Sequence, residues 1–277
     1  LKALEAFDLH GCTAIASLTA QNSVAVERID AVSAAQLDAQ LAALARDLRP
    51  RVVKTGMLGS VDNIRCVAVW LDRLRADGPV ALVVDPVRRA STGAALAADE
   101  LRQAFVAELL PRATLITPNR AEAAWLLGRG DSLETDDVPQ AAAGLRALGP
   151  RAVAVTGGDA GSDESLDWID TPQAQGWLAL PRLDVRHTHG TGCVHASSAA
   201  AALALGFCEA DATVIAKMAT TEALRHGYAA GKGAGPVRPR PGFALHAELL
   251  PQLRAAGPAG VSGFAPLSTR DMGLYPV

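Results

Sequence analysis

The stretch His187-Thr188-His189-Gly190-Thr191-Gly192-Cys193 is followed directly by a small, apolar run from Val194 to Leu205. A glycine-rich turn that opens into a helix aims several backbone N–H groups at one point, and the positive end of the helix dipole points the same way. Gly190 and Gly192 carry no Cβ, so an anion can approach their backbone closely. The stretch therefore predicts a site for a phosphate group in transfer, although taken alone it also fits a plain turn before a buried helix.

Cys193 stands at the start of the predicted helix. A thiol at a helix N-terminus commonly has a lowered pKa because the helix dipole stabilises the thiolate. We therefore expect a lowered pKa for Cys193. The other cysteines, Cys12, Cys66 and Cys208, form no C-x-x-C pair. This spacing predicts a reducing compartment and no zinc site.

The composition is that of a soluble globular protein. The chain has 277 residues, of which 49% are hydrophobic and 20% charged, with a net charge of −3. This length suits one large α/β domain, and the charge argues against nucleic acid or an anionic membrane surface as a partner. No apolar run reaches the length of a membrane span, and no signal peptide is present. We therefore expect a cytoplasmic protein.

Short apolar strands alternate with amphipathic helices along most of the chain. This alternation predicts an α/β fold in which helices cover both faces of a mostly parallel sheet. The expected strands are 13–18, 51–54, 80–84, 113–116 and 152–155, with a flap strand at 24–29 and a hairpin of 166–169 and 176–179. The expected helices are 1–9, 33–48 with Ser33 as its cap, 62–75, 99–110, 120–127, 138–148, 193–205 and 211–228.

Polar and glycine residues follow four of the expected strands, at Gly56-Met57, Asp85-Pro86, Pro118-Asn119 and Gly157-Gly158. Because the carboxyl ends of parallel strands lie at one edge of a sheet, we expect these clusters to converge on one crevice. Asp85 could hold Mg²⁺ through a water molecule or bind the unit that Mg²⁺ forms with a phosphate. The glycine pair suits a nucleotide phosphate.

Each of these clusters also has a purely structural interpretation. Asp-Pro is an ordinary turn, and Asn119 with Glu122 fits a helix capping box as well as a ligand pair on one helix face. Gln21 offers either a bidentate amide for the edge of a heterocycle or a loop amide bonded to backbone. Met57 either packs on a flat ring or fills the core.

Three other kinds of site receive little support. His187, His189 and His195 have no acidic partner between them, which disfavours zinc. The sequence has no Gly-x-Ser-x-Gly elbow for a Ser-His-Asp hydrolase. It also has no Gly-x-Gly-x-x-Gly in an early strand–helix unit, which disfavours dinucleotide binding.

Taken together, six segments resemble the hydroxymethylpyrimidine/phosphomethylpyrimidine kinases, members of the ribokinase-like superfamily. The segments are Leu-Thr-Ala-Gln-Asn (18–22), Lys-Thr-Gly-Met-Leu-Gly (54–59), Val-Val-Asp-Pro-Val (83–87), Leu-Ile-Thr-Pro-Asn-Arg-Ala-Glu-Ala (115–123), Thr-His-Gly-Thr-Gly-Cys (188–193) and Gly-Lys-Gly-Ala-Gly-Pro-Val (231–237). The resemblance covers almost all of residues 1–237. Cys193 is the discriminating detail, since most sugar kinases of the superfamily carry Asp there as the catalytic base.

The resemblance implies a ribokinase-like three-layer α/β/α fold with a small β flap, and two ATP-dependent phosphorylations in thiamine biosynthesis. The first acts on the hydroxymethyl group of 4-amino-5-hydroxymethyl-2-methylpyrimidine and the second on the resulting monophosphate. It implies catalytic roles for Cys193, Gly190, Thr191 and Gly192, pyrimidine binding by Gln21 and Met57, ATP or phosphate binding by Asp85, Asn119, Thr156, Gly157, Gly158 and Lys232, and Mg²⁺ binding by Asp85 and Glu122. A homodimer is also implied.

The chain departs from the family pattern at three places. The opening glycine-rich segment and a substrate-contacting Asp are absent before Leu1, so we expect that a further N-terminal segment precedes it. Thr156 stands where the family often has Lys, and Ser91 stands where a second Lys is usual. Arg88 or Arg89 could replace that second charge.

We expect the kinase domain to span residues 1–243 and residues 244–277 to form a tail. Its last residues, Leu274-Tyr275-Pro276-Val277, resemble the first barrel strand of thiamine phosphate synthase, so the tail could lead to such a domain. Two other functions stay open: another kinase of the superfamily, such as one for pyridoxal or a sugar, and a ligand-binding module of this fold without catalysis.

Overall fold

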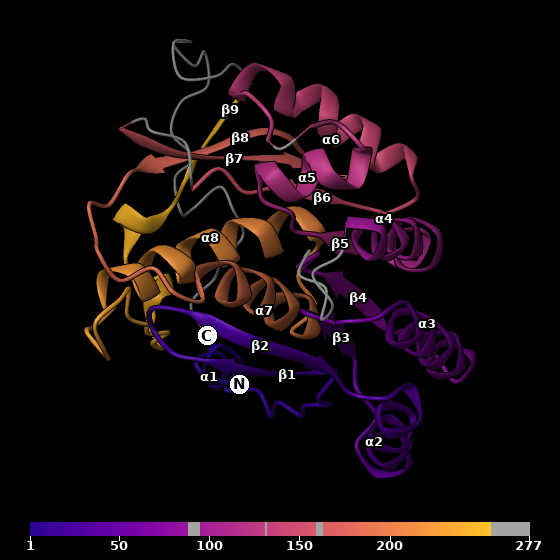
Figure 1. Cartoon of the computed structure of the whole chain (residues 1–277). Helices are drawn as coiled ribbons and strands as arrows, with labels where there is room; N and C mark the ends of the chain where they lie inside the picture. The colour runs from indigo at the N-terminus through magenta and orange to yellow at the C-terminus, as the bar shows by residue number, and fades with distance from the viewer. Residues whose placement is uncertain (88–94, 131, 159–162, 256–277) are drawn as a thin grey trace.

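The computed structural model describes residues 1–87, 95–130, 132–158 and 163–255 (Figure 1). Its strands are β1 (Ser17–Gln21), β2 (Val26–Ala31), β3 (Val52–Thr55), β4 (Ala81–Val84), β5 (Leu115–Ile116), β6 (Val153–Val155), β7 (Glu164–Asp170), β8 (Gln175–Pro181) and β9 (Gln252–Arg254). Its α-helices are α1 (Lys2–Glu5), α2 (Ala34–Asp47), α3 (Val61–Ala76), α4 (Ala95–Ala104), α5 (Arg120–Leu127), α6 (Val138–Ala147), α7 (Thr191–Ala204) and α8 (Glu209–Arg225).

The central sheet has the strand order β3-β4-β5-β6-β7-β8-β9. Strands β3 to β6 are parallel, and β7 to β9 extend the sheet in antiparallel fashion. Alternate strand residues face opposite layers: Leu82 and Val84 pack with α3 to α6, whereas Val83 packs with α7 and α8. The predicted α/β fold with helices on both faces of the sheet is confirmed (Figure 1).

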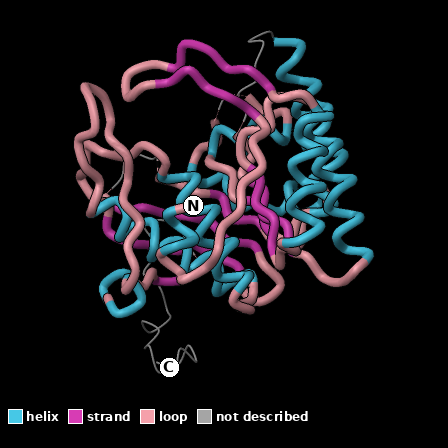
Figure 2. The backbone as a smooth tube through the Cα atoms, turned by 90° about the horizontal axis from the view of Figure 1, so that it is seen from below, coloured by secondary structure: helices cyan, strands magenta, loops and turns pink. Residues whose placement is uncertain are grey.

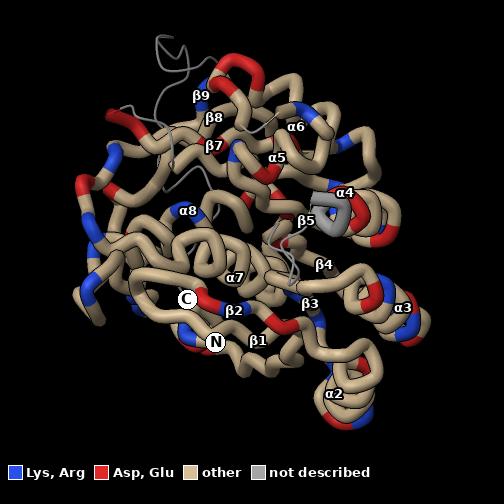
Figure 3. Tube along the Cα trace, in the orientation of Figure 1, with Lys and Arg blue, Asp and Glu red and all other residues tan. Residues whose placement is uncertain are grey.

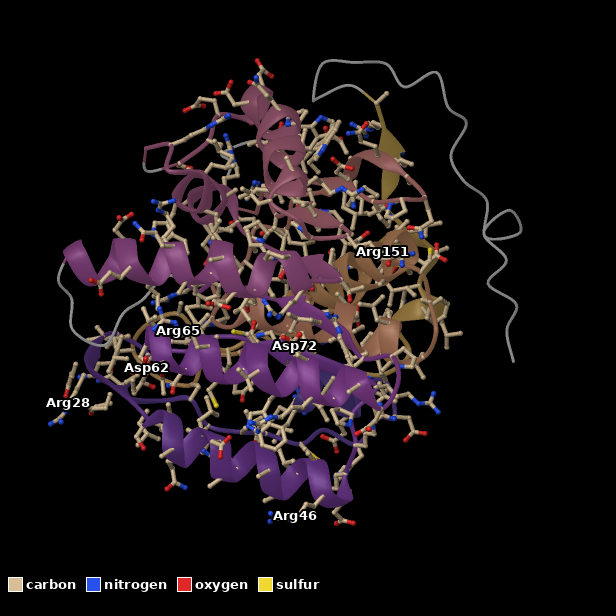
Figure 4. The ribbon with its side chains drawn as sticks, turned by 90° about the vertical axis from the view of Figure 1, so that its right-hand side faces the viewer. Arg28, Arg46, Asp62, Arg65, Asp72 and Arg151 are labelled. Atoms are coloured by element: carbon tan, nitrogen blue, oxygen red, sulfur yellow. The ribbon has the colours of Figure 1, made fainter. Side chains whose placement is uncertain are left out.

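The two helices on one face are built from small residues. The buried residues of α7 include five alanines, and α7 packs on both the sheet and α8. Small side chains let helix and sheet backbones approach closely, which brings the N-terminus of α7 against the ends of β3 and β4. Outer helices α2, α3 and α4 carry both signs of charge (Figure 3). In Figure 4, Arg46 lies at the end of α2, and Asp62 and Arg65 lie on α3.

The first two strands form a separate flap. β1 pairs with β2 in an antiparallel ribbon of two strands, and Figure 2 shows this ribbon apart from the central sheet. The predicted flap strand is confirmed, but the predicted strand at 13–18 is wrong, because the strand begins at Ser17. Upstream of it, the Gln40 side chain on α2 pairs with the backbone of Ile15 in place of a neighbouring strand, at 2.8 and 3.0 Å.

Other boundaries differ for local reasons. The predicted helix 1–9 is a single turn, because Asp8 adopts a left-handed φ of 58° and Leu9 N–H bonds back to Leu4 O. Helix α4 ends at Ala104 and continues as a π-helical turn over Phe105–Leu109. Ser33 caps α2 as predicted.

The chain contributes to the sheet beyond the predicted boundary at residue 243. Phe243 and Leu249 are buried, and β9 pairs with β8 at the antiparallel edge. The compact domain therefore extends at least to Arg254, and the boundary at 243 is corrected. The expected link to a second domain concerns residues 256–277, which lie outside the described residues.

Candidate active site

The ends of the parallel strands and the start of α7 meet at one edge of the sheet. Lys54 lies near the end of β3, and Asp85 directly follows β4. The Lys54 Nζ atom is 3.0 Å from Asp85 Oδ2, and both side chains are largely buried. Gly56 leaves the room that this lysine needs, since a Cβ there would come within 3.3 Å of Nζ. One ammonium and one carboxylate thus meet at this edge of the sheet. The region between the strand ends and the start of α7 is here called the crevice, and Lys54 and Asp85 are called its floor.

Cys193 reaches this floor from the first turn of α7. Partial burial raises the pKa of its thiol, and the carboxylates of Asp85 and Glu122 raise it further, whereas Lys54 acts in the opposite direction. The predicted proximity of Cys193 to Asp85 and Glu122 is therefore observed.

The predicted direction of the Cys193 pKa is wrong. Its side chain is exposed to solvent on one side. The surrounding protein and two carboxylates nevertheless disfavour the thiolate more than the helix dipole favours it. Neither carboxylate is close in sequence, so the helix start alone pointed the wrong way.

The glycine-rich turn before α7 has the geometry of an anion site. Gly190 adopts a left-handed φ of 85°, a conformation that favours glycine. The first intrahelical bond is donated by Val194 N–H to Gly190 O. Among the described residues, the structure records no acceptor for the N–H groups of Gly192 and Cys193. A Cβ added at Gly190 or Gly192 would meet open space, so the turn faces room for a ligand.

Thr191 departs from the expected role. Its N–H and its hydroxyl both donate to Thr188 O, at 3.2 and 2.6 Å. Its amide is therefore used to shape the turn, and the amides without a recorded acceptor among the described residues are those of the next two residues, Gly192 and Cys193. Thr191 fixes the turn in place and does not offer its own N–H to an anion.

Asn119 and Glu122 form the capping box that their spacing allowed. Asn119 Oδ1 accepts from Glu122 N–H at 2.8 Å, and Glu122 Oε2 accepts from Asn119 N–H at 2.9 Å. The structural interpretation is correct, yet Glu122 also lies close enough to Cys193 to raise its pKa. The box thus aims one carboxylate at the crevice.

The end of β6 differs from the sequence-based expectation. Thr156 N–H donates to Pro118 O, which places Thr156 beside Asn119. Gly157 is buried, and its N–H donates to Asp167 Oδ1 at 3.0 Å, so the expected phosphate contact through this amide is wrong. A Cβ at Gly157 would overlap the backbone carbonyl of Leu166, which explains the glycine. Gly158 is exposed, with open space around it.

A buried ion pair holds the carboxylate that accepts from Gly157 N–H. Lys217 Nζ on α8 lies 2.9 Å from Asp167 Oδ2 on β7. Burial acts to raise the pKa of Asp167, but Lys217, His195 and the Gly157 N–H together hold it below its usual value. Burial lowers the pKa of His195, which lies in the interior.

Gln21, Met57 and Lys232 are the remaining residues expected at the site. Met57 is half-buried just after β3, whereas Gln21 at the end of β1 and Lys232 after α8 are exposed. Within the part of the chain that the structure describes, no recorded contact joins Gln21 or Lys232 to Cys193 or Asp85. Ser91, Arg88 and Arg89 lie outside the described residues.

Lys54 is the functional residue that the sequence-based analysis missed. The signal was present, because Lys54 is one of only four lysines and lies near a strand end, two residues before a glycine. The position of its ammonium group beside Asp85 depends on the pairing of β3 with β4, which periodicity does not specify.

The described residues hold no group of three or more His, Cys, Asp or Glu side chains that could bind a metal by itself. Mg²⁺ commonly takes one or two carboxylates and completes its shell with water and substrate phosphates. Asp85 and Glu122, which face Cys193 from two different elements, fit that requirement. No helix in the described part of the chain has the length and apolar character needed to span a membrane.

Comparisons with known proteins agree with this geometry. The family model of phosphomethylpyrimidine kinase matches residues 1–238. The hydroxymethylpyrimidine/phosphomethylpyrimidine kinase of Synechococcus elongatus is 40% identical over 234 residues, covering 83% of this chain and 86% of the relative.

Two solved structures resemble the whole domain. The Staphylococcus aureus pyridoxal kinase in complex with ADP has a TM-score of 0.75 at 27% identity, covering 86% of this chain and 85% of that chain. The phosphomethylpyrimidine kinase of Clostridium difficile has a TM-score of 0.66 at 28% identity, covering 80% and 90%. By its sequence match over most of its length, this chain belongs to the phosphomethylpyrimidine kinase family and is a phosphotransferase.

Proposed function

We propose that this chain transfers the γ-phosphoryl group of ATP to the hydroxymethyl group of 4-amino-5-hydroxymethyl-2-methylpyrimidine and then phosphorylates the monophosphate, as a kinase of thiamine biosynthesis. The supporting observation is the turn Gly190–Cys193, whose open amides face a crevice floored by Lys54 and Asp85. Phosphoryl transfer depends on positioning and on stabilisation of charge, and this turn offers both.

The chain's own groups divide the work. The N–H groups of Gly192 and Cys193, with the positive end of α7, stabilise charge on the transferring group. Cys193 would lie near the acceptor oxygen and, as the thiolate that Lys54 favours, would take the hydroxyl proton. Thr191 holds the turn through its two bonds to Thr188.

Asp85 and Glu122 would hold Mg²⁺ together with the phosphates of ATP, and Asn119 fixes Glu122 through the capping box. When bound, the ion neutralises charge on the phosphate oxygens. Lys54 supplies positive charge at the same floor, in a chain that has Thr156 where a lysine is common in the family. Thr156, Gly158 and Lys232 would contact the nucleotide, Gly158 through the open space above it.

The pyrimidine would lie between the flap and the end of β3. The Gln21 amide can donate to and accept from the edge of the ring, and the Met57 side chain can pack on its face. We also propose a homodimer, which the resemblance implies, a cytoplasmic location, which the composition favours, and fusion to a thiamine phosphate synthase domain, which the sequence of the tail favours. Size-exclusion chromatography with light scattering would test the first.

A substrate panel tests the proposal. Formation of ADP would be measured with the pyrimidine alcohol, its monophosphate, pyridoxal and ribose. We expect the two pyrimidines to have the highest kcat/KM values. Pyridoxal is the second candidate because the pyridoxal kinase of Staphylococcus aureus shares this fold at a TM-score of 0.75. A higher kcat/KM with pyridoxal would replace the pyrimidine assignment, and nucleotide binding without turnover on any substrate would favour the non-catalytic module.

A further inference from the structure

The glycine-rich segment Gly231–Val237, here called the strap, joins two distant parts of the crevice. It follows α8 and carries three glycines at alternate positions. The proposed function uses only Lys232 of this segment and none of its glycines. None of the three glycines has a left-handed φ. The reason for glycine at these positions is therefore the space around them.

One end of the strap lies against the flap. Gly233 N–H donates to Ser23 Oγ at 3.2 Å. A Cβ at Gly233 would overlap the Ser23 carbonyl oxygen and come within 2.7 Å of its carbon. A Cβ at Gly231 would instead overlap the Ser23 side chain, with the hydroxyl oxygen as its nearest atom. The strap thus contacts the backbone of the flap at one glycine and a flap side chain at the other.

The other end of the strap holds the segment that leads into the anion turn. Gly235 N–H donates to His187 Nδ1 at 3.0 Å, and Gly235 O accepts from His189 N–H at 3.0 Å. Val237 N–H donates to His189 O at 3.0 Å, which completes a parallel bridge. A Cβ at Gly235 would overlap the carbonyl of Tyr228. Gly190 directly follows this bridged segment.

The flap turn is a rigid unit that has little other support. Asn22 Oδ1 accepts from the N–H groups of Val24 and Ala25, at 2.8 and 2.9 Å, and Asn22 N–H bonds to Ala25 O. The ribbon of two strands behind it is mostly exposed, and an isolated ribbon of this kind is marginally stable. Contacts of the strap therefore matter for where this turn, and Gln21 beside it, is held.

We propose that the strap is a positioning element that fixes the flap turn relative to the turn Gly190–Cys193, with Ser23, Gly233 and Gly235 as positioning residues. It rests on the proposed function in taking the flap as the support of the pyrimidine. The strap then sets the distance between the acceptor hydroxyl and the phosphoryl group, while the nucleotide side is set by the sheet.

Steady-state kinetics of three variants test this role. Gly233→Ala should lower kcat/KM for the pyrimidine about 10- to 100-fold, since a misplacement of about 1 Å can cost that much. Its KM for ATP should change by less than about 2-fold, which is within the variation expected when a single exposed contact is altered. Gly231→Ala should show the same pattern, and Ser23→Gly added to it should restore part of the activity, because it removes the overlap with the Ser23 side chain but also the hydrogen bond to Gly233. Ser23→Gly should not restore Gly233→Ala, where the overlap is with backbone.

Amide hydrogen exchange of residues 21–26, followed by mass spectrometry, supplies a readout that needs no substrate. Gly233→Ala should speed exchange there, and Ser23→Ala should do so to a smaller extent by removing one hydrogen bond. Gly144→Ala in α6 is the matched control, because its nearest neighbour would be a leucine methyl at an ordinary 3.4 Å.

Unchanged exchange in both Gly233→Ala and Ser23→Ala would overturn the strap, whatever substrate the enzyme uses. So would equal losses for ATP and pyrimidine, or rescue of Gly233→Ala by Ser23→Gly. If Gly233→Ala fails to fold, the exchange of Ser23→Ala decides alone. Faster flap exchange with no turnover on pyrimidines in the wild type would retain the strap and reject the proposed function.

Discussion

The floor of the crevice, formed by Lys54 and Asp85, and its rim, formed by the flap of β1 and β2, are built in different ways. At the floor, the side chains of Lys54 and Asp85 are 19% and 6% exposed. Beneath the floor, those of the ion pair Lys217 and Asp167 are 4% and 8% exposed. At the rim, Leu18 and Val24 of the flap are 57% and 69% exposed. The floor is held by charges inside a packed sheet, and the rim by a few hydrogen bonds and close glycine contacts.

This difference suggests a division of roles between the two regions. Groups that stabilise transferring charge work best when they are preorganised and partly dehydrated, which the strand ends provide. A ribbon of two strands can change its position without disturbing the core, which suits selection of the acceptor. Substitutions at the floor should therefore change chemistry or folding, and those at the rim should change KM for the acceptor.

The largest expected effect is on catalysis at the floor. Cys193→Ala should lower pyrimidine phosphorylation by about 10²- to 10⁴-fold, the usual contribution of a general base. Its melting temperature should hardly change, since the side chain is exposed. Cys66→Ala is the control, because Cys66 lies on α3 away from the crevice. Equal loss in Cys66→Ala, with Cys193→Ala near wild type, would refute the catalytic role, and a small loss would assign most of the catalysis to the turn amides.

The second effect is on folding below the floor. Lys217→Met leaves Asp167 buried without its main counter-charge, so the free energy of unfolding should fall by about 3–5 kcal/mol in urea titrations at pH 7. Adding Asp167→Asn should recover part of this loss. The Asp167 pKa is lowered in the folded state, so its stabilising contribution is present above the usual Asp pKa and is lost as pH falls through the folded value.

Arg151→Met provides the matched comparison for Lys217→Met. Arg151 also pairs with a buried carboxylate, that of Glu209 at 2.7 Å, but its own side chain is 65% exposed. Figure 4 labels it. The loss in this variant should be below about 1 kcal/mol, because water replaces the lost partner. Equal losses in Arg151→Met and Lys217→Met would contradict the importance of burial at the floor.

The sequence-based predictions succeed where the signal is local. Strand ends 55, 84 and 116 lie at one edge as expected from apolar runs alternating with helices, and the turn Gly190–Cys193 opens α7. The capping box of Asn119 and Glu122 was readable because both partners are three residues apart. These features depend on neighbours in the chain, so periodicity and spacing are enough to find them.

The failures all depend on distant partners. The start of β1 is set by a side chain of α2 that pairs with Ile15, and β9 joins the sheet through three residues with no apolar signal of their own. The direction of the Cys193 pKa depends on two carboxylates from other elements. Gly157 N–H donates to Asp167 because β7 pairs with β6, and the sequence pattern does not reveal this pairing.

A smaller effect is expected at Glu122, where the floor meets a helix cap. If Glu122 organises Mg²⁺, Glu122→Gln should lower activity in a way that excess Mg²⁺ partly restores. The neutral amide can still accept from Asn119 N–H, so the melting temperature should stay near that of the wild type. Both quantities would be measured on this one variant. A lower melting temperature with unchanged turnover would reduce Glu122 to its role in the cap.

The smallest effect is expected outside both regions, at the pair of Asp72 on α3 with Arg112. Arg112 donates to both carboxylate oxygens, at 3.0 and 2.8 Å, and the two side chains are 52% and 29% exposed. The hydrogen bond from Arg112 lowers the pKa of Asp72. The pair therefore stabilises the fold above the usual Asp value of 3.8, and this contribution is lost as pH falls through the folded value.

Asp72→Asn should lower the free energy of unfolding by less than about 1 kcal/mol at pH 7, because solvent screens an exposed pair. Urea titrations in low and in 1 M salt would measure it, and the difference from wild type should shrink in high salt. Asp62→Asn is the control, since its partner Arg65 is 3.9 Å away and both side chains are more exposed. A change in kcat, or a loss that salt leaves untouched, would show that this surface pair communicates with the floor and would break the distinction drawn here between the crevice and the outer helices.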